Sequence, residues 1–231
     1  MVNGTSPGFP TSEGRCVTQN HLPDEWEVDL AAWRDSVNRM TASESRARDW
    51  RRARYTFAFS LSDALVGAVE GHRIAGPVLY GVWLNWGLLY IGQTAEGERR
   101  LRDLPIGESH HLATTFPPET WERVVVIEWS RLPAAEGLAD EIRGVVGLAL
   151  EHRLQVAFNP LVNSERRTSR GGWRRVNWDV KRSQGARAAA EVSELYAQVE
   201  AVWNAAAAHQ GDPITQSEAH RIVFPARLPR L

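Results

Sequence analysis

The chain has 231 residues, a formal net charge of −1 and 43% hydrophobic residues, values typical of a globular domain with appendages. No apolar run approaches the roughly 20 residues of a membrane span, and the N-terminus lacks the basic and apolar regions of a secretory signal. We therefore expect a cytoplasmic protein with no membrane partner. Cys16 is the only cysteine, which excludes an intrachain disulfide and a cysteine-rich zinc site.

The N-terminal quarter contains two kinds of sequence. Residues 1–22 are rich in Gly, Ser, Thr and Pro and predict a disordered tail. After Asp24, a good helix-capping residue, Trp26, Leu30, Trp33 and Val37 recur at helical spacing. A second helix is expected from Ser43 to about residue 59, continuing or restarting over 62–69. We assign residues 23–75 to an N-terminal helical extension.

The central block, residues 76–163, reads as an α/β (α+β) domain. Two apolar runs flank Asn85-Trp86-Gly87 and predict a β-hairpin of strands 77–84 and 88–93. The order then continues with a helix over about 96–104, a helical or loop segment at 108–114, a buried strand over 122–129 and a helix over about 136–155. This order predicts a small three-stranded mixed sheet flanked by helices.

Residues 164–231 form a basic, tryptophan-containing segment, a helix over about 186–208 and an irregular tail. Residues 164–187 carry eight basic side chains against Glu165 and Asp179, a local balance of +6. Arginines of this kind fix phosphates and tryptophans stack on bases; the alternative is a solvated loop whose tryptophans pack on the core. The candidate nucleic-acid contacts are Arg166, Arg167, Arg170, Trp173, Arg174, Arg175, Lys181 and Arg182, and Trp178 is a second candidate for stacking.

The hairpin carries Tyr90-Ile91-Gly92, and with the order of elements that follows it resembles the GIY-YIG endonuclease family. Gly81-Val82-Trp83 falls where the first family motif would lie, so Trp83 stands where the family has a tyrosine. Tyr80, three residues earlier, would face away on a regular strand. We therefore expect Tyr90 to carry more of the general-base role.

The resemblance also implies the remaining site residues. Arg100 would hold phosphate oxygens in the fixed fork of its guanidinium. One histidine of the pair His110 and His111 would bind phosphate or transfer a proton, and we choose His110. Glu151 would bind the metal, Mg²⁺ or Mn²⁺, and Asn163 would hold the hydrogen-bond network. With Tyr80 and Tyr90, the predicted catalytic set is Tyr80, Tyr90, Arg100, His110, Glu151 and Asn163.

The helix expected over about 136–155, which would carry Glu151, includes Gly144 and Gly147. A glycine costs a helix interior about 0.5–1 kcal/mol relative to alanine. One explanation is that both glycines let the sheet or a substrate backbone approach the face of Glu151. Ordinary packing of the helix on the sheet is the alternative.

The function that the resemblance implies is a divalent-metal-dependent endonuclease that hydrolyses phosphodiester bonds, with double-stranded DNA as the expected substrate. One alternative is a nucleic-acid-binding module of the same fold, catalytically weakened by Trp83. Another is a protein-interaction domain whose N-terminal tryptophans bind a partner. A palindromic target would require a two-fold homodimer.

Overall fold

The computed structural model describes residues 23–107, 111–180 and 183–228, so the tail expected at residues 1–22 lies outside the described part. The chain divides into two units, residues 1–51 and 52–231. In the first unit, helix α1 (Pro23–Met40) is followed by the first turns of α2 (Glu44–Val66). No helix within the described ranges is long and apolar enough to cross a membrane.

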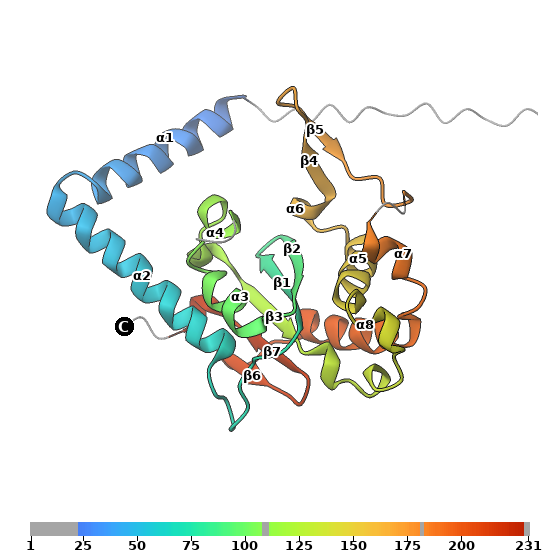
Figure 1. The fold of residues 1–231 in the computed structure, drawn as a ribbon. Helices are drawn as coiled ribbons and strands as arrows, with labels where there is room; N and C mark the ends of the chain where they lie inside the picture. Colours follow the sequence, from blue (N-terminus) through green and yellow to red (C-terminus); the bar gives the residue numbers. More distant parts are fainter. Residues whose placement is uncertain (1–22, 108–110, 181–182, 229–231) are drawn as a thin grey trace, which may run out of the picture. The chain divides into compact units, whose positions relative to one another are not determined.

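The second unit is built on a five-stranded sheet of order β2-β1-β3-β7-β6 (Figure 1). Every neighbouring pair is antiparallel, so the prediction of a three-stranded mixed sheet is wrong in strand number and in direction. The first three strands are found where we expected them. The strands are β1 (Val78–Leu84), β2 (Gly87–Thr94), β3 (Arg123–Ile127), β6 (Ile214–Gln216) and β7 (His220–Val223).

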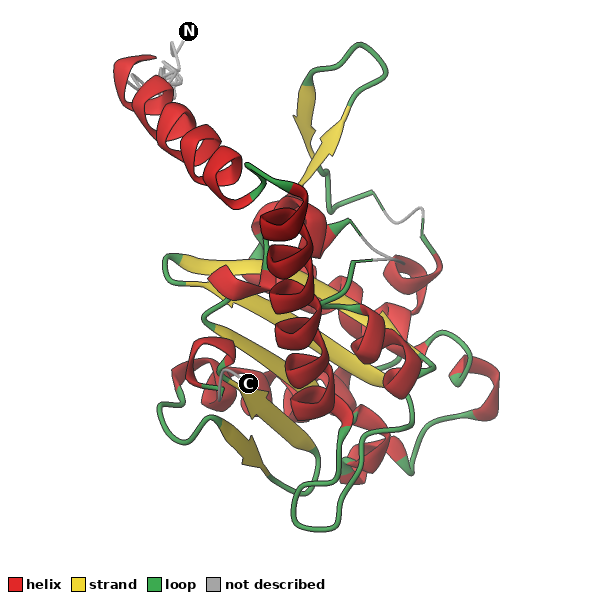
Figure 2. Ribbon diagram, turned by 90° about the vertical axis from the view of Figure 1, so that its left-hand side faces the viewer, coloured by secondary structure: helices red, strands yellow, loops and turns green. Residues whose placement is uncertain are grey.

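Helices cover both faces of the sheet. The part of α2 in this unit lies across one face (Figure 2), with α3 (Gly97–Asp103) and α4 (Leu112–Thr115). On the other face lie α5 (Val146–Phe158), α7 (Gln184–Ala188) and α8 (Ser193–Ala208). We name these the α3 face and the α5 face. Short 3₁₀ turns connect the elements, at Pro118–Thr120, Trp129–Arg131, Pro133–Ala135, Asp140–Ile142 and Pro225–Arg227.

Strand β1 lies between β2 and β3, and all seven of its residues are buried. Its side chains alternate between two hydrophobic clusters, as the period of a strand requires. Tyr80 and Val82 belong to the cluster on the α3 face, whereas Leu79 and Trp83 belong to the cluster on the α5 face. A tyrosine on β1 and a helix packed on the α5 face therefore lie on opposite sides of the sheet.

The helix expected over 136–155 is shorter than predicted. The segment before it forms 3₁₀ turns, and α5 begins at Val146. Gly144 therefore precedes the helix, and a Cβ added there would meet nothing within 4 Å, so it permits no close approach. At Gly147 an added Cβ would lie 2.7 Å from Oε1 of Gln93. The sheet does approach the helix there, through a side chain of β2.

The segment after α5 contains a hairpin that the sequence analysis did not predict. A short helix, α6 (Leu161–Ser164), leads into β4 (Glu165–Arg167), which pairs with β5 (Trp173–Arg175). This hairpin projects from the unit in both views (Figures 1 and 2). The single helix expected over 186–208 is also interrupted, because the chain turns between α7 and α8.

The last two strands are held in the sheet by a buried arginine. Arg221 on β7 is fully buried, and its guanidinium donates to the carbonyl oxygens of Ala64 (3.2 Å), Gly67 (2.8 Å) and His72 (3.0 Å). Its Nε donates to Oε1 of Gln216 on β6 at 2.6 Å. The carbonyls near the end of α2 lack partners within the helix, so the arginine joins the tail to α2 and satisfies them.

Candidate active site

Two tyrosines lie side by side on the α3 face near the edge strand β2. Tyr80 pairs with Gly92 and Tyr90 pairs with Val82 in the ladder, so both side chains point to the same face. Their ring centroids are 6.0 Å apart. Gly92 makes room for them, because an added Cβ would lie 2.6 Å from the Tyr80 hydroxyl and 2.8 Å from the Tyr90 ring.

Trp83 is not part of this pair. It lies on the opposite face, where its ring packs at 5.0 Å from that of Trp203 on α8. The expectation that Trp83 takes the place of a site tyrosine, with Tyr80 facing away, is therefore wrong. The ladder shifts register at this point, because Val82 pairs with Tyr90 whereas Trp83 pairs with Leu88. This bulge in β2 places Tyr90 on the face of Tyr80.

Arg100 on α3 contacts the tyrosine pair. Its Nε donates a hydrogen bond to the Tyr80 hydroxyl at 3.1 Å. The neighbouring Arg99 points elsewhere, since it is exposed and pairs with Glu96. Of the two adjacent arginines, Arg100 is thus the one that the helix directs to the site.

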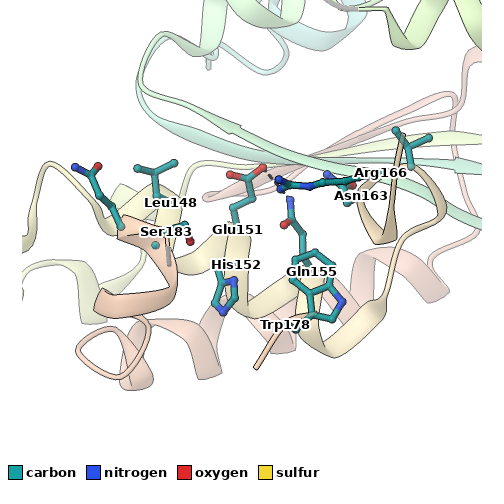
Figure 3. Close-up of a pocket in the computed structure, with 11 residues that line it drawn as sticks. Leu148, Glu151, His152, Gln155, Asn163, Arg166, Trp178 and Ser183 are labelled. Atoms are coloured by element: carbon teal, nitrogen blue, oxygen red, sulfur yellow. Dashed lines mark hydrogen bonds between the residues drawn. The ribbon is translucent and has the colours of Figure 1, made fainter. Parts of the chain in front are cut away.

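Glu151 reaches the same edge of the sheet from α5. Burial raises the pKa of Glu151 to about 7, although a hydrogen bond from Gln155 and the charge of Arg100 both lower it. Nε2 of Gln155 donates to Oε1 of Glu151 at 3.0 Å. Figure 3 shows Glu151 pointing toward the sheet, in a pocket of about 420 Å³ that His152 and Trp178 also line. We call this the Glu151 pocket.

Asn163 holds the outer edge of β2. Its Oδ1 accepts from the backbone N–H of Ile91 at 2.9 Å, and its Nδ2 donates to the Ile91 carbonyl at 3.1 Å. The side-chain amide therefore pairs with the edge strand as another strand would. Asn159 makes this possible, because its left-handed conformation (φ 46°) ends α5 and turns the chain back toward β2.

The two tyrosines differ in electrostatic environment. Burial raises the pKa of Tyr80, but the charge of Arg100 and hydrogen bonds from Arg100 and Tyr90 oppose that rise. Burial also raises the pKa of Tyr90, where Tyr80 and Glu151 reinforce the rise and the charge of Arg100 opposes it. The Tyr80 hydroxyl accepts a hydrogen bond from the Arg100 guanidinium, whereas the sequence analysis gave the larger role to Tyr90.

The predicted histidine is not placed by the structure, because His110 lies outside the described residues. His111 precedes α4 and is exposed. It lines a separate pocket of about 440 Å³ together with Trp173, not the Glu151 pocket. His152, directly after Glu151, is a histidine that the sequence analysis did not select; its ring meets that of Trp178 edge-on at 6.0 Å.

Part of the basic segment continues the Glu151 pocket. A second pocket of about 440 Å³ is lined by Arg166, Arg174 and Arg175, and it shares Arg166 and Trp178 with the Glu151 pocket. We call this second pocket the arginine groove. Arg167 and Arg170 are exposed outside it. Lys181 and Arg182 lie outside the described residues.

Gln155 is the site residue whose role the sequence analysis missed. It bonds Glu151 and also donates to the Ile91 carbonyl at 3.4 Å, so it connects the carboxylate to the strand that Asn163 holds. Its spacing, one helical turn after Glu151, is the only sequence signal for this role.

The donor set suits a weakly held divalent ion. No group of three or more His, Cys, Asp or Glu side chains is found among the described residues, and Glu151 is the carboxylate that lines its pocket. Mg²⁺ retains several waters and uses one or two carboxylates with substrate phosphates. A half-buried carboxylate with a raised pKa is favourable for a cation, since the cation would compensate the lost hydration. Glu151 therefore fits such an ion as a single carboxylate ligand.

Replacing Gly92 with alanine should disturb the tyrosine pair. The added methyl would overlap the Tyr80 hydroxyl, so we expect the free energy of unfolding to fall by about 1–3 kcal/mol, measured by urea denaturation. Gly144→Ala is the matched control, because a Cβ there meets nothing within 4 Å. Equal stability of the two variants would contradict the packing described here.

Glu151 should make stability depend on pH. Its raised pKa means that the folded protein binds a proton that the unfolded chain releases, so stability falls as pH rises from about 4.5 to about 7. Glu151→Gln should remove this loss and, without metal, exceed the wild type at pH 8.5 by on the order of 2–3 kcal/mol. Urea unfolding at pH 5.5 and 8.5 measures the difference. The same pH dependence in both proteins would refute the assignment.

Comparisons with known proteins do not add to this geometry. A scan against protein-family models finds no family that matches the chain. No curated protein and no solved structure matches it. Membership of the GIY-YIG family therefore stays a prediction from the residues quoted above.

Proposed function

We propose that the second unit is a divalent-metal-dependent phosphodiesterase that cuts nucleic acid, with double-stranded DNA as the substrate. One observation carries the proposal. Glu151, Arg100 and the pair of tyrosines meet at a strand edge held by Asn163, and the pocket there opens into the arginine groove. A carboxylate, a guanidinium and hydroxyls are the groups that phosphodiester hydrolysis requires.

Arg100 would bind the scissile phosphate and stabilise the charge that develops on it. Its guanidinium is oriented through the bond from Nε to Tyr80, and a guanidinium pairs with two phosphate oxygens in fixed geometry. Glu151 would hold the cation, which neutralises phosphate charge and activates water when bound. Both side chains are half-buried, which strengthens their interaction with charge on the substrate.

The tyrosine pair would position the attacking water and pass its proton on. Burial raises the pKa of both hydroxyls, so neither stores negative charge as a resident phenolate near neutral pH. Transfer through Tyr80 is favoured because Arg100 lies beside its oxygen. In this proposal the Tyr80 oxygen takes the proton of the water as its own hydroxyl proton leaves to solvent, so Tyr80 stays neutral, and Tyr90 supports it by hydrogen bonding.

Asn163 and Gln155 would act on the site without touching the phosphate. Both bond the Ile91 backbone between Tyr90 and Gly92, so they fix the strand that carries Tyr90. We assign them as positioning residues.

The alternative of a catalytically weakened binding module was based on Trp83 in place of a tyrosine. It loses this support, because Tyr80 lies beside Tyr90 and Trp83 lies on the opposite face. The reading as a protein-interaction domain retains support in the first unit. Trp33 on α1 is 63% exposed and Val28 is 67% exposed, so residues 23–51 present apolar surface. A homodimer formed through this segment stays a prediction.

DNA cleavage tests the proposed function. Supercoiled plasmid should be nicked or linearised by the wild type with Mg²⁺ and not with EDTA. Glu151→Gln and Arg100→Lys should each lower the single-turnover rate by on the order of 10²–10³-fold. The first removes the carboxylate charge that would hold the cation, and the second removes the guanidinium that would pair with two phosphate oxygens.

Two variants control for general damage. Arg99→Lys changes the neighbouring arginine that pairs with Glu96, and Glu194→Gln changes an exposed glutamate on α8; both should cleave at the wild-type rate. Cleavage that persists in EDTA or in Glu151→Gln would sink the proposal.

A further inference from the structure

Residues of the β4–β5 hairpin line two different pockets. Arg166 and Arg174 are directly opposed in the ladder, and both line the arginine groove. Like charges opposed in this way destabilise a hairpin unless an anion lies between them. The alternating positions on the other face are Glu165, Arg167, Trp173 and Arg175. Of these, Glu165 and Trp173 line the pocket that contains His111.

That pocket is apolar and aromatic. Its volume is about 440 Å³, and Leu112, Phe116, Leu161 and Trp173 contribute most of its wall. Trp173 is 69% exposed and Leu161 is 44% exposed, although large apolar side chains are normally covered. His111, Thr115 and Glu165 add hydrogen-bonding groups. An apolar pocket with a few polar groups is the usual form of a site for one small planar ligand.

The apolar pocket adjoins the Glu151 pocket. Val162 lines both of them, and the next residue, Asn163, holds β2 beside Tyr90. The Glu151 pocket therefore has the arginine groove on one side and the apolar pocket on another. A nucleotide chain with a phosphate at Glu151 and its backbone along the arginines would bring an adjacent base to the apolar pocket.

We propose that the apolar pocket receives one unstacked nucleobase of the nucleic acid whose phosphate lies in the Glu151 pocket. The proposal rests on the proposed function, and it specifies the substrate as DNA with an unpaired or extruded base. Trp173 and Phe116 offer aromatic faces for stacking, and the polar groups offer partners for the base edge. A base that is already unpaired enters most easily, because its unstacking cost is lowest.

Binding of a bulged duplex by the full chain tests this proposal. The probe is a DNA duplex with a single bulged 2-aminopurine, compared with the same duplex without a bulge, in metal-free buffer. We expect the wild type to bind the bulged duplex at least about tenfold more tightly, as stacking on an aromatic side chain predicts. Stacking on Trp173 should also quench the 2-aminopurine fluorescence.

Three variants assign the effect to Trp173. Trp173→Ala should bind both duplexes with equal affinity and should not quench the fluorescence, whereas Trp173→Phe should retain the preference. Trp86→Ala is the matched control, because Trp86 is 58% exposed but lies in the β1–β2 turn and does not line the pocket. This control should behave as the wild type does.

The outcomes separate this proposal from the proposed function. Equal affinity of the wild type for both duplexes, or a preference that survives Trp173→Ala, would overturn the base pocket even if Glu151-dependent cleavage is found. A Trp173-dependent preference without magnesium-dependent cleavage would support the base pocket and overturn the nuclease. Failure to bind either duplex would overturn the base pocket, whereas plasmid cleavage with Mg²⁺ decides the proposed function separately.

Discussion

The pairing of the Asn163 amide with the backbone of Ile91 is the interaction on which the candidate site depends. An edge strand presents unpaired N–H and C=O groups, and here one side chain satisfies both at a single residue. The same contact fixes the path of the chain after α5, because Asn163 lies shortly beyond the left-handed residue Asn159 that ends the helix. Glu151 and Tyr90 come from different layers of the fold, and this contact joins the segments that carry them.

Charge and burial then give the site its chemistry. Burial raises the pKa of Glu151, and the positive charge of Arg100 lowers it. Arg100 also donates a hydrogen bond to Tyr80. Each group is thus in an environment that favours a charged ligand: the carboxylate favours a cation and the guanidinium favours a phosphate. Functional sites often combine desolvation with a specific charge partner in this way.

Much of the fold could be predicted from the sequence, because the hairpin and the strand at Arg123–Ile127 have strong local patterns of aromatic and β-branched residues. Strands β6 and β7 could not, since they are three and four residues long and depend on Arg221 bonding carbonyls about 150 residues earlier. The β4–β5 hairpin escaped prediction because its strands are short and charged, without an apolar alternation.

The candidate site was predictable in its membership more than in its orientation. Tyr80, Tyr90, Arg100, Glu151 and Asn163 were all selected through the resemblance to the GIY-YIG family, but the faces of Tyr80 and Trp83 were assigned the wrong way. Which face of β1 a residue occupies follows from its partner on β2 and from the bulge there, and neither is visible in the order of residues. Gln155 was missed because a glutamine on a helix has no distinguishing pattern.

We propose that Asn163 assembles a metal-dependent nuclease site at the edge of β2. Single-turnover cleavage of plasmid DNA by Asn163→Ala, with Mg²⁺ and beside the wild type, tests it most directly. We expect the cleavage rate to fall as much as in Glu151→Gln, while the far-ultraviolet circular dichroism spectrum shows that the five-stranded sheet is retained. Wild-type cleavage by Asn163→Ala, or no magnesium-dependent cleavage by the wild type, would contradict it.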